Sequence, residues 1–171
     1  MRRLRLMLAT VMAVATVSGC ATVNKLTDGV SDPMTPEEAK SQAIAGARDV
    51  VKTLQLKDVG ATFRYEACGD EGKPPYRGLV QIDYAHAPTY EGSQAEITAF
   101  VEELKRDGWS TDSGFTSHAP SLAKNNVVTL LRPYAPNGSG GIEVRGECRD
   151  TTDHLGNRDT VNTPLPPDAL T

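Results

Sequence analysis

Three kinds of side chain in this sequence could do chemistry: histidines, paired carboxylates and cysteines. The histidines are His86, His118 and His154, and each falls in a segment without an apolar period, which predicts a loop. Asp83 precedes His86 by three residues and could orient its imidazole for acid–base catalysis, and histidines brought together by folding could bind zinc. We interpret all three as solvated loop residues and keep a zinc or acid–base site as the alternative.

The paired carboxylates, Glu37-Glu38 and Glu102-Glu103, both fall in predicted helices. Solvation and the helix dipole explain them without catalysis. Motifs for a zinc protease, a phosphate-binding loop and a nucleophile elbow are absent from the sequence. Gly138-Ser139-Gly140-Gly141 predicts a turn, because no strand-to-helix pattern surrounds it. We therefore expect a protein without enzymatic activity, and we assign no catalytic residue, cofactor or metal ligand.

The first cysteine, Cys20, follows a segment that is typical of export. Three arginines lie within the first five residues, and residues 6–17 are apolar apart from two threonines. This run is too short to span a bilayer, which takes about 20 apolar residues. Val17-Ser18-Gly19-Cys20 matches the lipobox of bacterial lipoproteins, in which the cysteine thiol is alkylated with diacylglycerol. The match predicts a cleaved signal peptide at residues 1–19 and lipid attachment at Cys20; a plain secretory signal and an uncleaved membrane helix are the alternatives.

With Cys20 carrying lipid, Cys68 and Cys148 remain as an even pair in an exported chain, which predicts a disulfide. Closing a loop of about 80 residues would stabilise the fold by roughly 4–4.5 kcal/mol on the chain-entropy model. A reactive thiol or a metal-ligand pair is the alternative. Two observations disfavour this alternative. The sequence has no C-x-x-C spacing, and only Arg145 and Arg149 place positive charge near either cysteine in sequence.

Removal of residues 1–19 would leave 15 basic and 22 acidic side chains, a formal net charge of −7. This balance excludes nucleic acid as an expected partner, and it leaves the acyl chains to hold the membrane. Residues 20–34 are predicted to form the lipidated cysteine and a flexible tether with a root-mean-square span of about 20 Å. Residues 35–154 are predicted to form one domain, and residues 155–171, rich in proline, a disordered tail.

The domain pattern predicts two helices and five strands. Thr35, Pro36 and Glu38 form a capping box that starts a helix ending near Leu56, and a second box at residues 93–96 starts a helix that stops before Gly108. The five predicted strands are residues 62–68, 79–85, 109–115, 126–133 and 142–148. The order α-β-β-α-β-β-β predicts a two-layer α+β sandwich, with an antiparallel five-stranded sheet and both helices on one face.

Aromatic residues are sparse, and four of them could line a sugar- or lipid-binding surface. Tyr84 and Trp109 stand at alternating positions that are typical of a core or its boundary. Tyr76 and Tyr90 fall in predicted loops around the first hairpin, so they are the better candidates for contact with a partner. The chain is short of apolar positions for both a sealed core and an acyl-chain cavity.

The lipobox, the helix ending at Asp107-Gly108-Trp109 and the strand that closes at Cys148 resemble those of small actinobacterial, mycobacterial-type lipoproteins of the LppA-like kind. Gly146-Glu147-Cys148 is similar to a Gly-acidic-Cys sequence that closes the last strand of that family, and Cys68 fits as the partner cysteine. The likeness covers residues 35–150. It implies a lipid-anchored envelope protein of a family of uncharacterised function, and it supplies no catalytic residue.

We expect a non-catalytic binding or scaffolding module on the outer side of the cytoplasmic membrane. Its expected partners are the membrane, through the covalent lipid, and an envelope protein or wall component. A lipid or glycolipid carrier is one alternative, and an envelope hydrolase that uses a loop histidine with Asp83 is another.

Overall fold

The computed structural model describes residues 30–171, so the predicted signal peptide, Cys20 and most of the predicted tether lie outside the described residues. Within that part, the helices are α1 (Pro36–Leu54) and α2 (Tyr90–Arg106). The strands are β1 (Gly60–Ala67), β2 (Tyr76–Asp83), β3 (Ser121–Lys124), β4 (Val127–Arg132), β5 (Gly141–Arg145) and β6 (Thr163–Pro164). Among these described residues, no helix is long and apolar enough to cross a membrane.

The strands of the described residues form one sheet in the order β3-β4-β5-β2-β1-β6, and every neighbouring pair is antiparallel. β1 and β2 form a hairpin over their full length, from Gly60 opposite Asp83 to Ala67 opposite Tyr76. β5 lies between β2 and β4, so the last of the longer strands completes the centre of the sheet. The α+β class and the antiparallel sheet are confirmed, but the sheet has six strands and not the predicted five.

One predicted strand is wrong, and two strands of the structure, β3 and β6, were not predicted. In residues 109–115 only Ser110 forms a bridge, opposite Ala123, and the remainder is an irregular loop that leads to β3. Trp109 is buried directly after α2, where its N–H donates to the carbonyl of Leu104 at 3.0 Å. The alternation in residues 109–115 therefore marks the end of α2 and the loop after it, and not a strand. β3 lies instead between residues 115 and 126, where the sequence predicted a turn.

The C-terminal segment corrects the prediction of a disordered tail at residues 155–171. Thr163 pairs with Phe63 of β1, and the N–H of Leu165 donates to the carbonyl of Ala61 at 2.9 Å. Leu170 lies in the hydrophobic core. The segment lacks an apolar period, but two well-placed leucines and an edge strand that tolerates proline are enough to hold it on the domain.

The helix starts follow local sequence rules to different degrees. The capping box of α1 is confirmed, because the N–H of Thr35 donates to Glu38 at 2.8 Å and the N–H of Glu38 donates to Thr35 at 3.2 Å. α2 instead begins earlier than predicted, capped by Thr89. Ser93, expected as the cap, is buried and accepts a hydrogen bond from the N–H of Tyr134 at 2.8 Å.

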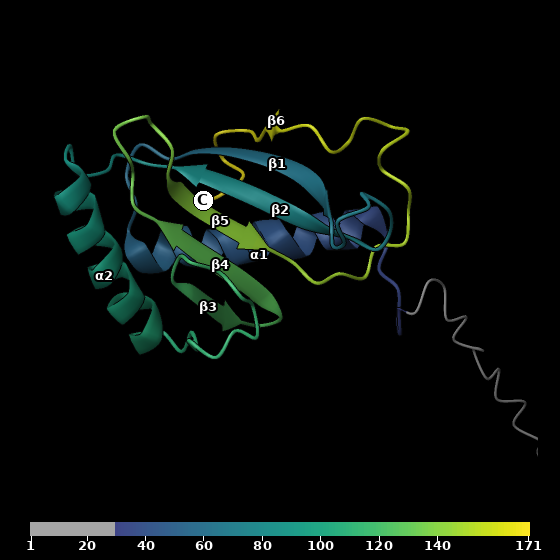
Figure 1. The fold of residues 1–171 in the computed structure, drawn as a ribbon, viewed down its shortest axis with the longest axis horizontal. Coiled ribbons are helices and arrows are strands. Elements are labelled where there is room, and N and C mark those ends of the chain that lie inside the picture. The colour runs from purple at the N-terminus through teal and green to yellow at the C-terminus, as the bar shows by residue number, and fades with distance from the viewer. Residues whose placement is uncertain (1–29) are drawn as a thin grey trace, which may run out of the picture.

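The core lies between the helices and the sheet. α1 runs along one face of the sheet and α2 crosses one end of the molecule (Figure 1). α1 approaches β2 closely because Gly78 has no side chain: a Cβ there would lie 2.5 Å from the carbonyl oxygen of Ala39. Buried side chains of both helices then join those of the central strands in one cluster, which includes Ala43, Ala47, Val50, Ile97, Leu104, Val80, Ile82, Leu131, Ile142 and Val144.

Residues 30–34, assigned to the tether by sequence, pack on the domain. Val30 is buried, and the N–H of Met34 donates to the carbonyl of Arg149 at 2.8 Å. Arg149 also bonds to Asp32 through the side-chain carboxylate and, at 2.7 Å, through the backbone carbonyl. The chain therefore enters the domain at the end opposite to α2 (Figure 1).

Candidate binding groove and charged sheet face

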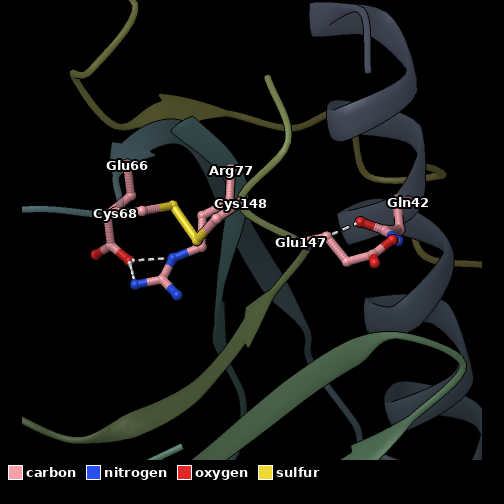
Figure 2. The surroundings of a disulfide bond; sticks show 6 residues. All are labelled: Gln42, Glu66, Cys68, Arg77, Glu147 and Cys148. Atoms are coloured by element: carbon pink, nitrogen blue, oxygen red, sulfur yellow. Dashed lines mark hydrogen bonds and ion pairs between the residues drawn. A yellow bond between two sulfur atoms is a disulfide. The ribbon is translucent and has the colours of Figure 1, made fainter. Parts of the chain in front are cut away.

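Cys68 and Cys148 form the predicted disulfide, with their Cα atoms 6.0 Å apart. The bond joins the end of β1 to the segment that follows β5 (Figure 2). The neighbouring Glu147 is held by Gln42 of α1, whose Nε2 donates to its carboxylate at 2.8 Å and whose Oε1 accepts from its N–H at 2.9 Å. The disulfide therefore ties β1 to the segment after β5, and the bonds between Gln42 and Glu147 hold that segment on α1, which is a structural role.

His154 lies in the interior, which corrects its interpretation as a solvated loop residue. Its Nε2 lies 2.7 Å from Oδ2 of Asp150, its Nδ1 lies 3.4 Å from Oδ2 of Asp159, and its ring stacks on Tyr65 with the centroids 3.7 Å apart. Burial also raises the pKa of Tyr65 to about 12. Because His154 and Asp150 are shielded from solvent, this pair stabilises the fold and does not face a substrate.

The other two histidines are exposed and lie apart from it. His86 stacks on Tyr134 at 3.6 Å, and its Nδ1 lies 2.8 Å from the carbonyl of Ala87. Asp83 accepts a hydrogen bond from the hydroxyl of Tyr134 at 3.4 Å. Its partner is therefore this tyrosine, and not His86 as the sequence suggested. Within residues 30–171, no group of three histidine, cysteine or carboxylate side chains could hold a metal ion.

Of the two tyrosines proposed as partner contacts, one is buried and the other is exposed. Tyr76 is fully buried, because β2 begins at this residue and its side chain points into the interior, where its hydroxyl donates to the carbonyl of Gly72. It cannot touch a partner. Tyr90 begins α2, and 40% of it is exposed. Tyr84 and Trp109 are buried, as expected for core positions.

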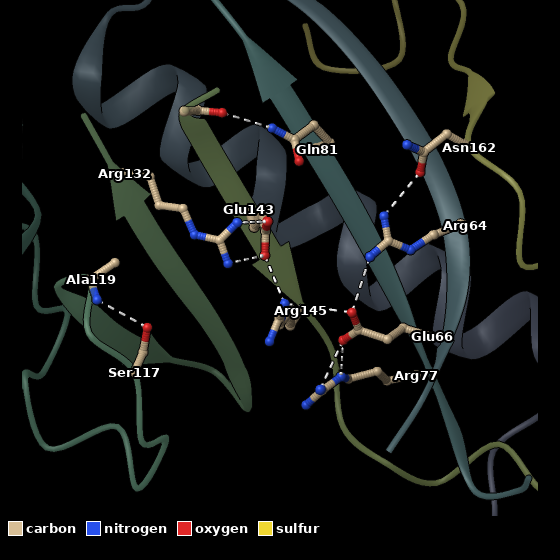
Figure 3. Close-up of polar contacts among 11 residues, drawn as sticks. Arg64, Glu66, Arg77, Gln81, Ser117, Ala119, Arg132, Glu143, Arg145 and Asn162 are labelled. Carbon is tan, nitrogen blue, oxygen red and sulfur yellow. Dashed lines mark hydrogen bonds and ion pairs between the residues drawn. The ribbon is translucent and has the colours of Figure 1, made fainter. Parts of the chain in front are cut away.

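The sheet face turned away from α1 carries a row of charges that we call the arginine ladder. Its members are Arg64, Glu66, Arg77, Arg132, Glu143 and Arg145 (Figure 3). Glu66 lies 3.1 Å from Arg64, 2.8 Å from Arg77 and 3.5 Å from Arg145. Glu143 bonds to Arg145 at 2.8 Å and to both Nη atoms of Arg132. Four guanidinium groups thus share two carboxylates.

Most of the ladder is shielded from water. The ring of Phe115, in the loop before β3, lies 5.0 Å from the guanidinium carbon of Arg145 and 5.5 Å from that of Arg77. Burial lowers the pKa of Arg77, and the like charge of Arg145 adds to this while Glu66 opposes it. The Nε of Arg145 is buried without a hydrogen-bond partner among the described residues. The face therefore holds positive charge that its own carboxylates do not fully balance.

The ladder as a whole was not predicted, although part of its signal is present in the sequence. In the predicted strand at residues 62–68, Arg64 and Glu66 alternate with apolar residues, which places both on one polar face. The same alternation holds for Glu143 and Arg145 of β5. What could not be predicted was that β5 would lie beside β2 and so join the charges of distant segments.

The exposed end of the ladder opens into a groove of about 610 Å³, which we call the α2 groove. Its lining comprises Tyr90, Gln94, Ile97 and Thr98 of α2, Ser117 to Pro120 of the following loop, and Arg132 and Pro133 at the end of β4. The side chain of Arg132 is 44% exposed, so its charge reaches the groove. None of these described lining residues is an aspartate or a glutamate.

Comparison with known proteins places the chain in a family. Residues 35–165 match the family model described as "Putative lipoprotein LppJ". Proteins of that name from Mycobacterium tuberculosis strains CDC 1551 / Oshkosh and ATCC 25618 / H37Rv, and from Mycobacterium bovis strain ATCC BAA-935 / AF2122/97, are each 29% identical over 175 residues. Each alignment covers 94% of this chain and 92% of the relative. No solved structure matches the chain.

The resemblance to mycobacterial-type lipoproteins is thereby confirmed, with LppJ as the matching family where the sequence motifs suggested an LppA-like one. The match extends over the two helices, the disulfide, the ladder and the α2 groove. The chain belongs to the LppJ family of lipoproteins.

Proposed function

We propose that this lipoprotein is a non-catalytic binding module that holds a component of the cell envelope through the α2 groove. The observation that carries the proposal is the position of the groove. α2 crosses one end of the domain, while the described chain begins, before α1, at the other end, on the side that leads toward the predicted lipid anchor (Figure 1). On a chain anchored through Cys20, the groove would face away from the membrane, on the extracytoplasmic side.

The groove carries the kinds of side chain that a contact surface needs. Tyr90 and Ile97 supply apolar area, Gln94 and Thr98 supply hydrogen-bonding groups, and Arg132 supplies charge. Its volume of about 610 Å³ lies within the range of ligand sites in proteins, about 300–1,000 Å³. The groove is open to solvent and not an enclosed cavity, which favours a ligand that lies across the surface over a buried acyl chain.

The histidines give little support to the hydrolase alternative. His154 has carboxylate partners but is buried, and His86 lies against a backbone carbonyl and a tyrosine ring. His118 is exposed in the groove, where the described lining holds no carboxylate to orient it. General acid–base catalysis requires both access to substrate and an oriented imidazole.

The proposal is tested by photocrosslinking in living cells. A photoreactive phenylalanine analogue replaces Tyr90 in one variant and Val161, a 62% exposed residue near β6 and outside the groove, in a matched control. We expect a discrete crosslinked product from position 90 that position 161 does not form. The same product from both positions, or none from position 90, contradicts the proposal.

The anchor is tested separately by mass spectrometry of the mature protein. We expect an N-terminal Cys20 that carries a diacylglyceryl group. An unmodified N-terminus at any other residue would contradict the anchor while leaving the crosslinking result to stand or fall on its own.

A further inference from the structure

We propose that the ligand of the α2 groove is an acidic saccharide, whose carboxylate binds Arg132 and whose ring packs on Tyr90. This inference deepens the proposed function and rests on it. It depends on three features of the groove: its charge, the way Arg132 is held, and the mixture of ring and hydrogen-bonding side chains around it.

The charge of the groove is opposite to that of the protein. The mature chain predicted from the sequence has 22 acidic and 15 basic side chains, so a surface chosen at random would be acidic. The α2 groove instead presents one arginine, one histidine and, among its described lining residues, no carboxylate. An anion therefore finds an attractive site here and repulsion over the average surface of the domain.

The arginine ladder makes this charge a fixed feature. Glu143 is almost fully buried and divides its carboxylate between Arg132 and Arg145, and Arg145 divides its charge between Glu143 and Glu66. Positive charge therefore remains in the row, and its most exposed member is Arg132, at the groove. Both Nη atoms of Arg132 bond to Glu143, which orients the guanidinium plane. A guanidinium has five N–H donors, so donors remain for a ligand carboxylate.

The remaining walls fit a sugar better than a peptide. Tyr90 offers an exposed ring, and Gln94, Thr98 and His118 offer donors and acceptors for hydroxyl groups around it. A bound peptide strand would need unpaired backbone groups at a sheet edge. On the nearest edge, that of β3, Ala123 already exchanges hydrogen bonds of 2.9 and 2.8 Å with Ser110, and the hydroxyl of Ser121 bonds to the loop at Phe115, so little of this edge is free for a peptide strand. The groove thus offers a ligand side-chain groups and an aromatic ring more than a free backbone edge.

Saturation-transfer NMR on the full-length lipoprotein in lipid nanodiscs tests the inference, with empty nanodiscs as the blank. The probes are D-glucuronate, D-glucose and N-acetyl-L-glutamate, which separate a carboxylated sugar from a neutral sugar and from an acidic amino-acid group. We expect transfer to glucuronate that is strongest at its ring protons. Neither of the other probes should bind as tightly. Arg132→Gln should weaken glucuronate binding by about tenfold or more, the loss expected for a charged hydrogen bond.

Three further variants keep the test independent of folding. Thr98→Glu places a carboxylate in the groove at an exposed helix position and should abolish glucuronate binding, while the uncharged Thr98→Gln, which keeps a hydrogen-bonding group there, should weaken it far less. Arg106→Gln removes an arginine from the same helix outside the groove and should leave binding unchanged. Equal binding of glucose and glucuronate, tighter binding of N-acetylglutamate, or Thr98→Glu behaving as Thr98→Gln would each overturn the assignment.

Failure of this inference is distinguishable from failure of the proposed function. If position 90 forms its specific crosslink in cells but glucuronate does not bind, the groove remains a contact surface and the acidic-sugar assignment is wrong. If the crosslink is absent as well, the proposed function fails with it.

Discussion

The imidazole of His154 and the carboxylate of Asp150 lie 2.7 Å apart with both side chains shielded from solvent. The backbone of Asp150 pairs with Tyr76 at the start of β2, its N–H donating at 3.1 Å and its carbonyl accepting at 2.6 Å. The pair therefore fixes the segment after β5 against the central strands, close to the disulfide.

His154→Ala should destabilise the fold by about 2–4 kcal/mol, because it leaves the buried carboxylate of Asp150 without its side-chain partner and opens a cavity beside Tyr65. Urea unfolding followed by circular dichroism measures the change. His118→Ala, at an exposed loop position, is the control and should stay within about 0.5 kcal/mol of the parent protein. Equal effects of the two changes would refute the buried pair.

Gly78→Ala should be costly although it adds a single methyl group. The new Cβ would lie 2.5 Å from the carbonyl oxygen of Ala39 and 3.0 Å from the Cβ of Ala43, so α1 would have to move away from β2. We expect a loss of about 1–3 kcal/mol in thermal or urea unfolding. Gly60→Ala is the control in the paired strand: its added methyl group would meet nothing within 4 Å, so it should change stability little.

The tail can be tested with two leucines of different exposure. Leu170 is 6% exposed and lies in the core, whereas Leu155 is 54% exposed. Leu170→Ala should cost about 2 kcal/mol or more in unfolding free energy, and Leu155→Ala should cost less than about 0.5 kcal/mol. If both substitutions were neutral, the C-terminal segment would not be part of the folded domain.

Asp107 should make stability depend on pH in the acidic range. Hydrogen bonds from Lys124 and then Thr53 hold the pKa of this carboxyl below its ordinary value of 3.8. A lowered folded-state pKa contributes stability above the unfolded-state value and loses it as pH falls through the folded-state pKa. The melting temperature of Asp107→Asn should therefore lie below that of the parent protein near pH 6, and the difference should shrink as the pH falls below 3.8 and through the folded-state pKa. A gap that persists unchanged at low pH would contradict this.

Local signals in the sequence predicted a good part of the fold. The capping box at Thr35 and Glu38 lies in contiguous residues, so α1 could be placed to within a residue at its start. Strand alternation located β1, β4 and β5 closely, and the even pair Cys68 and Cys148 predicted the disulfide. Each of these features is decided by neighbours in sequence or by the chemistry of a residue type.

The misses depend on contacts between distant segments. Leu170 holds the C-terminal segment in place because it packs into the core. Tyr76 is buried because β2 begins at this residue, earlier than the alternation of the sequence indicated. His154 is buried because Asp150, four residues earlier, is itself held by Tyr76. The α2 groove was missed for the same reason: Arg132 and Tyr90 meet only after β4 and α2 have packed.

The packing of residues 30–34 on the domain limits how far the protein can reach. Asp32 and Met34 are bound to Arg149, so the connection from Cys20 to the domain shrinks to residues 21–29. Whatever their conformation, the ten steps from Cys20 to Val30 span at most about 36 Å. A domain of this size adds a few tens of ångströms more. A lipid-anchored copy would therefore search only a thin layer above the membrane, and its partner would have to enter that layer to be captured.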